Sequence, residues 1–119
     1  MVNNVKFSRK LFNLAAINNI PFIYASSAAT YGGLENNFSD KHEMMGDLVP
    51  LNRYGYSKKL FDDYVLSAAN KPSHFFGLKF FNVYGPNEYH KGEMRSMAHK
   101  SFHQLKLAMK PFVSKKKKK

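Results

Sequence analysis

The chain has 119 residues, a length that fits one domain, and 44% of them are hydrophobic, including 11 Phe and 7 Tyr. This composition favours a packed core over disorder, and the absence of cysteine excludes disulfides and thiolate metal sites. No apolar run approaches the ~20 residues that span a bilayer, and the amino terminus does not resemble a signal peptide, so we expect a cytoplasmic protein with no membrane partner.

The positive charge is concentrated at the carboxyl end. The formal net charge is +11, and the last five residues are all lysine. A block of like charges is typical of a disordered tail, so we predict such a tail over residues 113–119 and a folded segment over residues 1–112. We expect no specific nucleic-acid binding, because the rest of the chain does not interleave arginines with aromatic residues.

The first half of the chain predicts a helix, a strand and a long loop. Apolar side chains recur at helical spacing over residues 5–18, and Pro21 cannot continue that helix. The apolar residues at this spacing are Phe7, Leu11, Leu14 and Ala15. Residues 22–26 are apolar and aromatic, which predicts a short buried strand, and the polar residues 32–53 are predicted to form a functional or mobile loop.

The second half of the chain predicts a helix over residues 56–68, a strand over residues 75–84, and a last helix over residues 94–109. Strands that alternate with helices form parallel sheets, in which ligands bind beyond the carboxyl ends of the strands. Ser27 and Asn82 both lie at the carboxyl ends of such strands, and Tyr54 starts a helix near the same edge. We therefore expect one site at this edge of the sheet.

Tyr54 and Lys58 are four residues apart at the start of a predicted helix, so they share one face of it. A free phenol has a pKa of about 10 and is a weak base at neutral pH, but a nearby ammonium favours the phenolate. The pair is therefore a candidate unit for moving a proton to and from a sugar hydroxyl, with Ser27 as its hydrogen-bonding partner. The spacing alone also fits a half-buried tyrosine and a solvated lysine.

Two histidines, His99 and His103, are also four residues apart and could ligate a metal on one face of the last helix. No third ligand is apparent in the sequence. We therefore predict no metal site.

Three blocks, in this order, resemble the extended short-chain dehydrogenase/reductase family of nucleotide-sugar epimerases and dehydratases. They are YASSAATYG at residues 24–32, YGYSK at residues 54–58 and FFNVYGP at residues 80–86. The HKGEM block at residues 90–94 is similar to that of the ADP-glyceromanno-heptose 6-epimerases within this family. The resemblance covers the chain from about residue 3 to residue 109.

The resemblance implies an α/β fold, a partial Rossmann-like doubly wound parallel sheet, and a nicotinamide cofactor, either NADP or NAD. It implies that Ser27 hydrogen-bonds the reacting hydroxyl, that Tyr54 takes its proton, and that Lys58 holds the ribose hydroxyls of the cofactor. Lys91 matches the lysine that gives a proton on the other side of the sugar.

The family's other binding residues also have counterparts in this sequence. The cofactor would contact Asn3, Tyr54, Lys58 and Val83. The nucleotide-sugar substrate would contact Ser27, Asn82, Glu93 and Lys100. Glu93 departs from the family pattern, because many heptose epimerases carry serine there, so its substrate contacts are open.

The resemblance therefore implies a nucleotide-sugar epimerase that interconverts ADP-D-glycero- and ADP-L-glycero-manno-heptose by transient oxidation and re-reduction. Two alternatives stay open. Another nucleotide-sugar 4-epimerase or a dehydratase of the family would need Ser27, Tyr54 and Lys58 but not Lys91. A non-catalytic basic fragment would bind polyanions through its lysines.

The sequence departs from the family in length. Its relatives begin with a Gly-x-x-Gly-x-x-Gly turn that holds the pyrophosphate of the cofactor, and this chain has none. It is predicted to lack the N-terminal dinucleotide-binding half and most of the C-terminal substrate domain, and we expect little or no activity from it alone. The terminal lysines suggest a frameshift or an incomplete gene. Full-length relatives are expected to be homo-oligomers.

Overall fold

The computed structural model describes residues 2–33 and 38–106, and these fall into two compact units, one that ends at Phe81 and one that begins at Asn82. The predicted tail, residues 113–119, and the predicted end of the last helix near residue 109 lie outside the described residues. No helix in the described ranges is long and apolar enough to cross a membrane.

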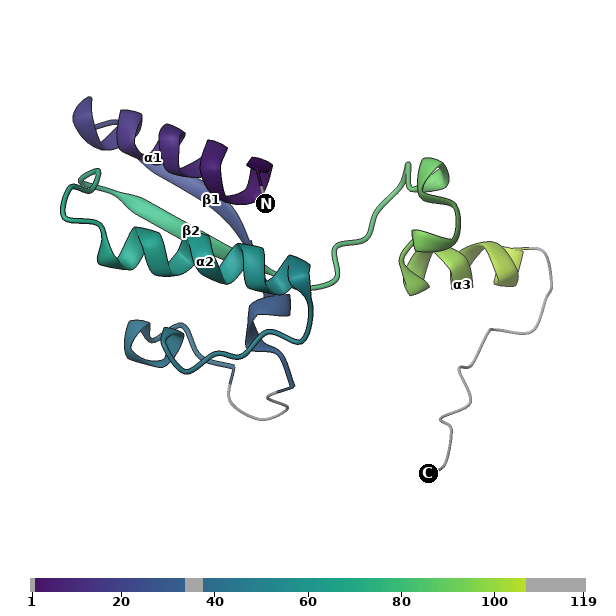
Figure 1. Ribbon diagram of the computed structural model, residues 1–119. Helices are drawn as coiled ribbons and strands as arrows, with labels where there is room; N and C mark the ends of the chain where they lie inside the picture. Colours follow the sequence, from purple (N-terminus) through teal and green to yellow (C-terminus); the bar gives the residue numbers. More distant parts are fainter. Residues whose placement is uncertain (1, 34–37, 107–119) are drawn as a thin grey trace. The chain divides into compact units, whose positions relative to one another are not determined.

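The first unit confirms the predicted helix–strand–helix–strand order (Figure 1). Its elements are η1 (Val2–Phe7), a π-helix that runs into α1 (Ser8–Ile17), then β1 (Phe22–Ser27), η2 (Ala28–Tyr31), η3 (His42–Met45), α2 (Arg53–Ser67) and β2 (Phe75–Phe80). The short 3-10 helix η3 lies within the predicted loop, residues 32–53. Helix α2 begins three residues before the predicted start because the side chain of Asn52 caps it, accepting a hydrogen bond from the Gly55 amide at 2.8 Å.

Strands β1 and β2 pair in parallel, with Phe22 opposite Phe75 and Ser27 opposite Phe80. The strands are joined through α2, as expected for a parallel pair. The expected α/β fold with a parallel sheet is therefore confirmed. Strand β2 ends at Phe80, whereas the apolar run predicted a strand to residue 84, so Asn82 and Val83 lie beyond the strand.

An aromatic core fills the space between one face of the sheet and the two helices. Phe12 of α1 is fully buried and meets the rings of Phe22, Phe61 and Phe75 edge-to-face, with centroids 5.4 to 6.4 Å apart. Val65 of α2 completes the buried cluster. Edge-to-face packing of this kind adds to the hydrophobic stabilisation that burial alone provides.

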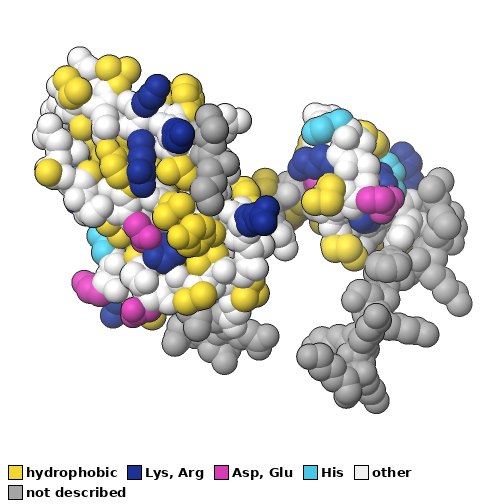
Figure 2. Space-filling model, viewed as in Figure 1, with side chains coloured by type: hydrophobic (Ala, Val, Ile, Leu, Met, Phe, Trp, Pro, Cys, Tyr) yellow, Lys and Arg dark blue, Asp and Glu magenta, His cyan; other side chains and the backbone are white. Residues whose placement is uncertain are grey.

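Of the four apolar residues that the spacing of α1 picked out, only Ala15 is packed, and the main buried residue is Phe12. Phe12 and Ala15 are buried, whereas Phe7, Leu11 and Leu14 are between 42% and 57% exposed. Figure 2 shows hydrophobic side chains lying on the surface of this unit among lysines and arginines. Periodicity alone located the helix but not its packed face, because α1 has apolar side chains on more than one side.

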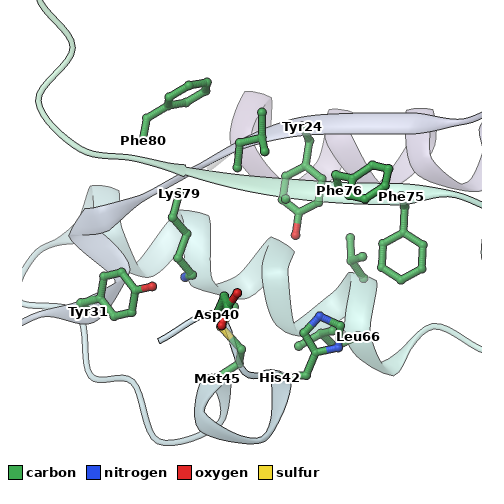
Figure 3. A pocket seen from close by; sticks show the side chains of 13 residues that line it. Tyr24, Tyr31, Asp40, His42, Met45, Leu66, Phe75, Phe76, Lys79 and Phe80 are labelled. Carbon is green, nitrogen blue, oxygen red and sulfur yellow. The ribbon is translucent and has the colours of Figure 1, made fainter. Parts of the chain in front are cut away.

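The other face of the sheet is apolar and exposed. It carries Ile23 on β1 and three side chains on β2, and all four are at least 46% exposed. The three on β2 are Phe76, Leu78 and Phe80. Figure 3 shows Phe80 pointing to the side of the sheet opposite Lys79.

The second unit contains η4 (Tyr89–Met94) and α3 (Met97–Lys106). The predicted last helix is present, but it begins at Met97, whereas the prediction placed its start at Met94, and Ser96 precedes it. The carboxylate of Glu88 accepts hydrogen bonds from the Gly85 amide and from the amide and hydroxyl of Ser96 at 2.8 to 3.0 Å. These bonds join the loop before η4 to the start of α3.

Gly77 has no side chain because the ring of Tyr24, on the neighbouring strand, lies across its position. A Cβ atom on Gly77 would lie 2.4 Å from the Tyr24 hydroxyl and 2.5 Å from the ring carbon that bears it. The ring has little room to move, since it packs against Phe61 with centroids 4.9 Å apart. We expect Gly77→Ala to lower the free energy of unfolding by about 1–3 kcal/mol, measured by urea denaturation.

The matched control is Gly46→Ala, because a Cβ atom at Gly46 would meet nothing within 4 Å and its φ of −61° suits alanine. This variant should be neutral or slightly more stable. Equal stability of the two variants would contradict the steric explanation.

Candidate functional site

Tyr54 and Lys58 share one face at the start of α2, as predicted. The Lys58 ammonium lies 5.8 Å from the centre of the Tyr54 ring, and the Tyr54 side chain is about half exposed. A charged amine at this distance from a phenol ring interacts with it electrostatically. The structure thus brings these two predicted residues together at the surface.

The start of α2 lies close to the end of β1 and to the turn η2 that follows it. The Lys58 ammonium donates a hydrogen bond of 2.9 Å to the carbonyl of Ala25, two residues before Ser27. A Cβ atom on Gly55 would lie 2.5 Å from the carbonyl oxygen of Ala29 in η2. Only glycine therefore lets the first turn of α2 approach the turn that follows Ser27 this closely.

Ser27 is the last residue of β1, at the carboxyl edge of the sheet, and it is buried. Its hydroxyl oxygen accepts a hydrogen bond from the Ala29 amide at 3.2 Å and so caps η2. Its carbonyl accepts one from the Thr30 hydroxyl at 2.8 Å. Because a hydroxyl that accepts one hydrogen bond can still donate another, Ser27 retains a donor.

Asn3 lies in η1, which is fastened to the same end of α2. Its neighbour Asn4 donates a side-chain hydrogen bond of 3.1 Å to the Ser57 hydroxyl, and Ser57 donates one of 2.7 Å to the carbonyl of Tyr54. The side chain of Asn3 itself is exposed. Spacing gave no sign of Asn4 or Ser57, since their contact joins residues 53 apart.

A buried group of charged and hydroxyl side chains lies behind Ser27, and the sequence did not reveal it. The carboxylate of Asp62 on α2 accepts hydrogen bonds from the Ser26 hydroxyl at 2.6 Å and from the Lys79 ammonium at 3.1 Å. Lys79 also donates to the Thr30 hydroxyl, and its ammonium lies 4.9 Å from the centre of the Tyr31 ring. We call these five residues the buried polar network.

The strand alternation around Lys79 was the available signal for this network. Phe75 and Lys79 are an even number of residues apart on β2, so the side chain of Lys79 points toward the helices, as Phe75 does. Figure 3 shows Lys79 and Tyr24 extending from the sheet to the same side. A lysine on the packed face of a strand needs a buried partner of opposite charge or a hydrogen-bond acceptor. The position of Lys79 in the sequence, however, did not show that this partner is Asp62.

The charge of Asp62 also acts on Tyr24. Burial raises the pKa of the Tyr24 phenol well above its usual value, and the negative charge of Asp62 raises it further. Tyr24 is therefore a neutral hydrogen-bond donor at physiological pH, in contrast to a tyrosine tuned for proton transfer.

Two of the hollows beside α2 are lined by residues of the buried polar network or of the candidate site. The larger one, of about 580 Å³, lies along β2 and is lined by aromatic side chains, including Tyr24 and Tyr31, together with Lys79, Asp40 and His42 (Figure 3). A smaller, more polar cleft of about 220 Å³ is lined by Asn4, Ser8, Tyr24, Ala25, Lys58, Phe61 and Asp62. The second cleft contains the Lys58 side chain and therefore belongs to the candidate site.

The remaining predicted site residues belong to the second unit. Lys91 lies 3.5 Å from the buried Glu88 carboxylate, and its side chain is about half exposed. The Lys100 ammonium donates to the carbonyl of Glu93 and lies 3.3 Å from its side-chain carboxylate, so these two predicted substrate residues are paired. Asn82 and Val83 are both exposed.

The two histidines of α3 form part of a separate apolar pocket. The rings of His99 and His103 are 4.6 Å apart, and both meet the ring of Tyr89 edge-on. Burial lowers the pKa of His103, and the neighbouring His99 lowers it further. Within residues 2–33 and 38–106, no group of three or more metal-ligating side chains occurs.

The parallel strands, the helix that connects them and the polar residues at their carboxyl edge define a Rossmann-like α/β protein. The sequence profile of the NAD dependent epimerase/dehydratase family matches residues 1–116. The chain therefore belongs to this family.

Named relatives agree with this assignment. The chain is 52% identical over 108 residues to ADP-L-glycero-D-manno-heptose-6-epimerase of Fusobacterium nucleatum subsp. nucleatum, and 50% identical over 105 residues to the protein of that name from Nitratidesulfovibrio vulgaris. These matches cover 89% and 88% of this chain and 32% of each relative.

A solved structure shows the same fold. The crystal structure of Helicobacter pylori ADP-L-glycero-D-manno-heptose-6-epimerase matches with a TM-score of 0.72 and 33% identity. The match covers 87% of this chain and 32% of that one. The expected partial Rossmann-like fold is confirmed, and the chain spans about a third of the length of the relatives it matches.

Glu88 gives the second unit a measurable dependence on pH. Hydrogen bonds from the amide and hydroxyl of Ser96 lower the pKa of the Glu88 carboxyl from 4.5 to about 2. Because the folded-state pKa is the lower one, the carboxylate stabilises the unit above about pH 4.5, and this contribution is lost as the pH falls toward 2. The Ser96 amide resonance in NMR should therefore shift within this acidic range.

Glu88→Gln is the matched control, because the amide keeps the shape but does not titrate. In that variant the Ser96 amide should be insensitive to pH over the same range. A Ser96 resonance in the parent chain that moves with a midpoint near pH 4.5 would contradict the lowered pKa.

Proposed function

We propose that this chain provides catalytic residues of a nucleotide-sugar epimerase, which interconverts ADP-D-glycero- and ADP-L-glycero-manno-heptose with NADP or NAD. The observation that carries the proposal is the placement of the Lys58 ammonium 5.8 Å from the Tyr54 ring, beside the strand end that carries Ser27. The identity of about half its residues to named heptose epimerases supports the choice of substrate.

The cleft beside Lys58 fits the ribose of a dinucleotide. An ammonium has three N–H donors, and the Ala25 carbonyl takes one of them, which leaves donors for ribose hydroxyls. The cleft is also lined by Asn4 and Ser8, whose side chains can bind hydroxyl groups. When bound, a nicotinamide cofactor supplies the acceptor and donor of hydride for sugar oxidation and reduction.

Tyr54 and Ser27 would act on the sugar hydroxyl together. The exposed phenol of Tyr54 takes the hydroxyl proton, and the Lys58 ammonium places positive charge where negative charge develops on the phenol oxygen. Ser27 donates a hydrogen bond to the same sugar oxygen, since its hydroxyl already accepts from the Ala29 amide. Proton transfer by a positioned group contributes typically about 10²–10⁴-fold to a rate.

Epimerisation needs a second proton donor, because the oxidised carbon must be reduced from its opposite face. We assign this role to Lys91, with Glu88 holding its ammonium at 3.5 Å. Asn3 and Val83 would contact the cofactor. Asn82, Glu93 and Lys100 would contact the nucleotide-sugar, where the Lys100 charge suits a diphosphate.

The first test replaces the matched 108-residue segment of the Fusobacterium nucleatum relative with this chain, so that the residues act within a full-length protein. The chimera should interconvert the two ADP-heptoses, as followed by NMR of the sugar. Tyr54→Phe should lower kcat by about 10²–10⁴ with little change in KM, because it removes only the proton-transferring hydroxyl. Tyr56→Phe, two residues away on the same helix, is the control and should retain activity.

A folded chimera that binds cofactor but converts no ADP-heptose would refute the assignment of substrate. Equal losses in Tyr54→Phe and Tyr56→Phe would refute the role of Tyr54.

Lys91→Ala distinguishes a heptose epimerase from other enzymes of the family. In the chimera it should abolish interconversion of the two sugars, while absorbance of the reduced nicotinamide shows that sugar oxidation continues. Lys91→Arg and Lys41→Ala are the controls for charge and for loss of a lysine elsewhere. Unchanged interconversion in Lys91→Ala would refute the role of Lys91 and leave the chemistry to Ser27, Tyr54 and Lys58, the residues that the alternative 4-epimerase or dehydratase would need.

A further inference from the structure

The geometry points to Lys79 and Asp62 as positioning residues, which act through Ser26 and Thr30 to fix the Ser27 hydroxyl relative to Tyr54. Lys79 does not line the cleft beside Lys58, and Asp62, which does, is assigned here only the role that it exerts through Ser26. The inference rests on the proposed function, because fixing Ser27 matters to catalysis only if Ser27 binds the sugar.

Asp62 connects Ser27 to the helix that carries the acid/base pair. It lies on α2, one turn after Lys58 and two turns after Tyr54, and it is 1% exposed. Its Oδ2 atom accepts a 2.6 Å hydrogen bond from the hydroxyl of Ser26. The residue before Ser27 is therefore tied to α2 by a short, charge-assisted bond.

Lys79 connects the other side of Ser27 to the same carboxylate. Its ammonium lies 3.1 Å from Asp62 Oδ2 and donates to the hydroxyl of Thr30, whose own hydrogen goes to the Ser27 carbonyl at 2.8 Å. Thr30 is fully buried, so water does not compete for these bonds. The backbone on both sides of Ser27 is thus held by one ion pair.

The burial of this ion pair favours a role in geometry over one in stability. The Lys79 side chain is 12% exposed and that of Asp62 is 1% exposed, so both charges are largely removed from water. Buried pairs are often no more stabilising than apolar side chains of the same volume, although removing one partner alone is strongly destabilising. What apolar residues could not supply is the set of directed hydrogen bonds to Ser26 and Thr30.

The network also joins α2, β2 and η2 to β1, the strand that carries Ser26 and Ser27. Asp62 comes from α2, Lys79 from β2 and Thr30 from η2, and Tyr31 in η2 contributes its ring beside the Lys79 ammonium at 4.9 Å. A shift of any of these elements would break a bond of the network. The Ser27 hydroxyl consequently has a fixed place beside the start of α2.

The test uses the full chain and needs no turnover. Thr30→Val removes the hydroxyl that links Lys79 to Ser27 and keeps the side-chain shape, and Thr30→Ser keeps the hydroxyl. Amide hydrogen exchange is measured by NMR at Ala29, which donates to Ser27 Oγ, and at Ala68, which donates to the Tyr64 carbonyl at the far end of α2. Thr30→Val should speed exchange at Ala29 roughly tenfold relative to Ala68, and Thr30→Ser should not.

The ion pair is tested with Lys79→Met/Asp62→Leu, which replaces both charges by apolar side chains, and with Lys79→Arg, which keeps the donor. The double variant should unfold cooperatively in urea and yet show faster amide exchange at Ala29 than the parent chain. Lys79→Arg should keep the Ala29 protection of the parent chain. Unchanged Ala29 protection in both Thr30→Val and the folded double variant would overturn the inference. If the double variant does not fold, Thr30→Val against Thr30→Ser decides alone.

Failure of the epimerase proposal leaves this test intact, because hydrogen exchange reports the backbone near Ser27 and not catalysis. Within the active chimera, Thr30→Val should lower kcat more than it raises KM, as expected for a misplaced Ser27 hydroxyl. A kcat equal to that of Thr30→Ser would overturn the catalytic part of the inference.

Discussion

The close packing of the first turn of α2 against the end of β1 and the turn η2 that follows it places Tyr54 and Lys58 beside Ser27. It requires a glycine at position 55, because a side chain there would collide with the Ala29 carbonyl. It brings the Lys58 ammonium to the Ala25 carbonyl at 2.9 Å, so the lysine is oriented before any ligand arrives. The proposed acid/base pair thus depends on the close approach of the backbone at Gly55 to the backbone at Ala29. This approach lets Lys58 reach the Ala25 carbonyl.

Local sequence signals predicted the parts of this arrangement that depend on neighbouring residues. The helix face shared by Tyr54 and Lys58 follows from their spacing alone, and the Asn52 cap explains why α2 starts before its apolar stripe. The Lys79–Asp62 pair could not be predicted in this way. Its members are 17 residues apart, on a strand and a helix, and only the packing of α2 against the sheet brings them together.

The packed face of α1 and the end of β2 show the same limit of local reasoning. The helix has apolar side chains on several sides, and the choice of Phe12 is made by the rings of Phe22, Phe61 and Phe75 around it. The apolar run after β2 continues past Phe80, but backbone pairing with β1 stops there because β1 itself ends at Ser27. Hydrophobicity predicted burial at these positions, while tertiary contacts decided where each element packs and ends.

The bare apolar face of the sheet, with Ile23, Phe76, Leu78 and Phe80, has a consequence for handling this chain in solution. Sheet faces of this kind attract one another, and the formal net charge of +11 keeps copies apart by mutual repulsion. Added salt screens that repulsion within about 10 Å at 0.1 M, while it leaves the apolar attraction in place. We therefore expect colloidal stability to fall as ionic strength rises, so that dilute buffers, and not saline ones, keep the chain dispersed.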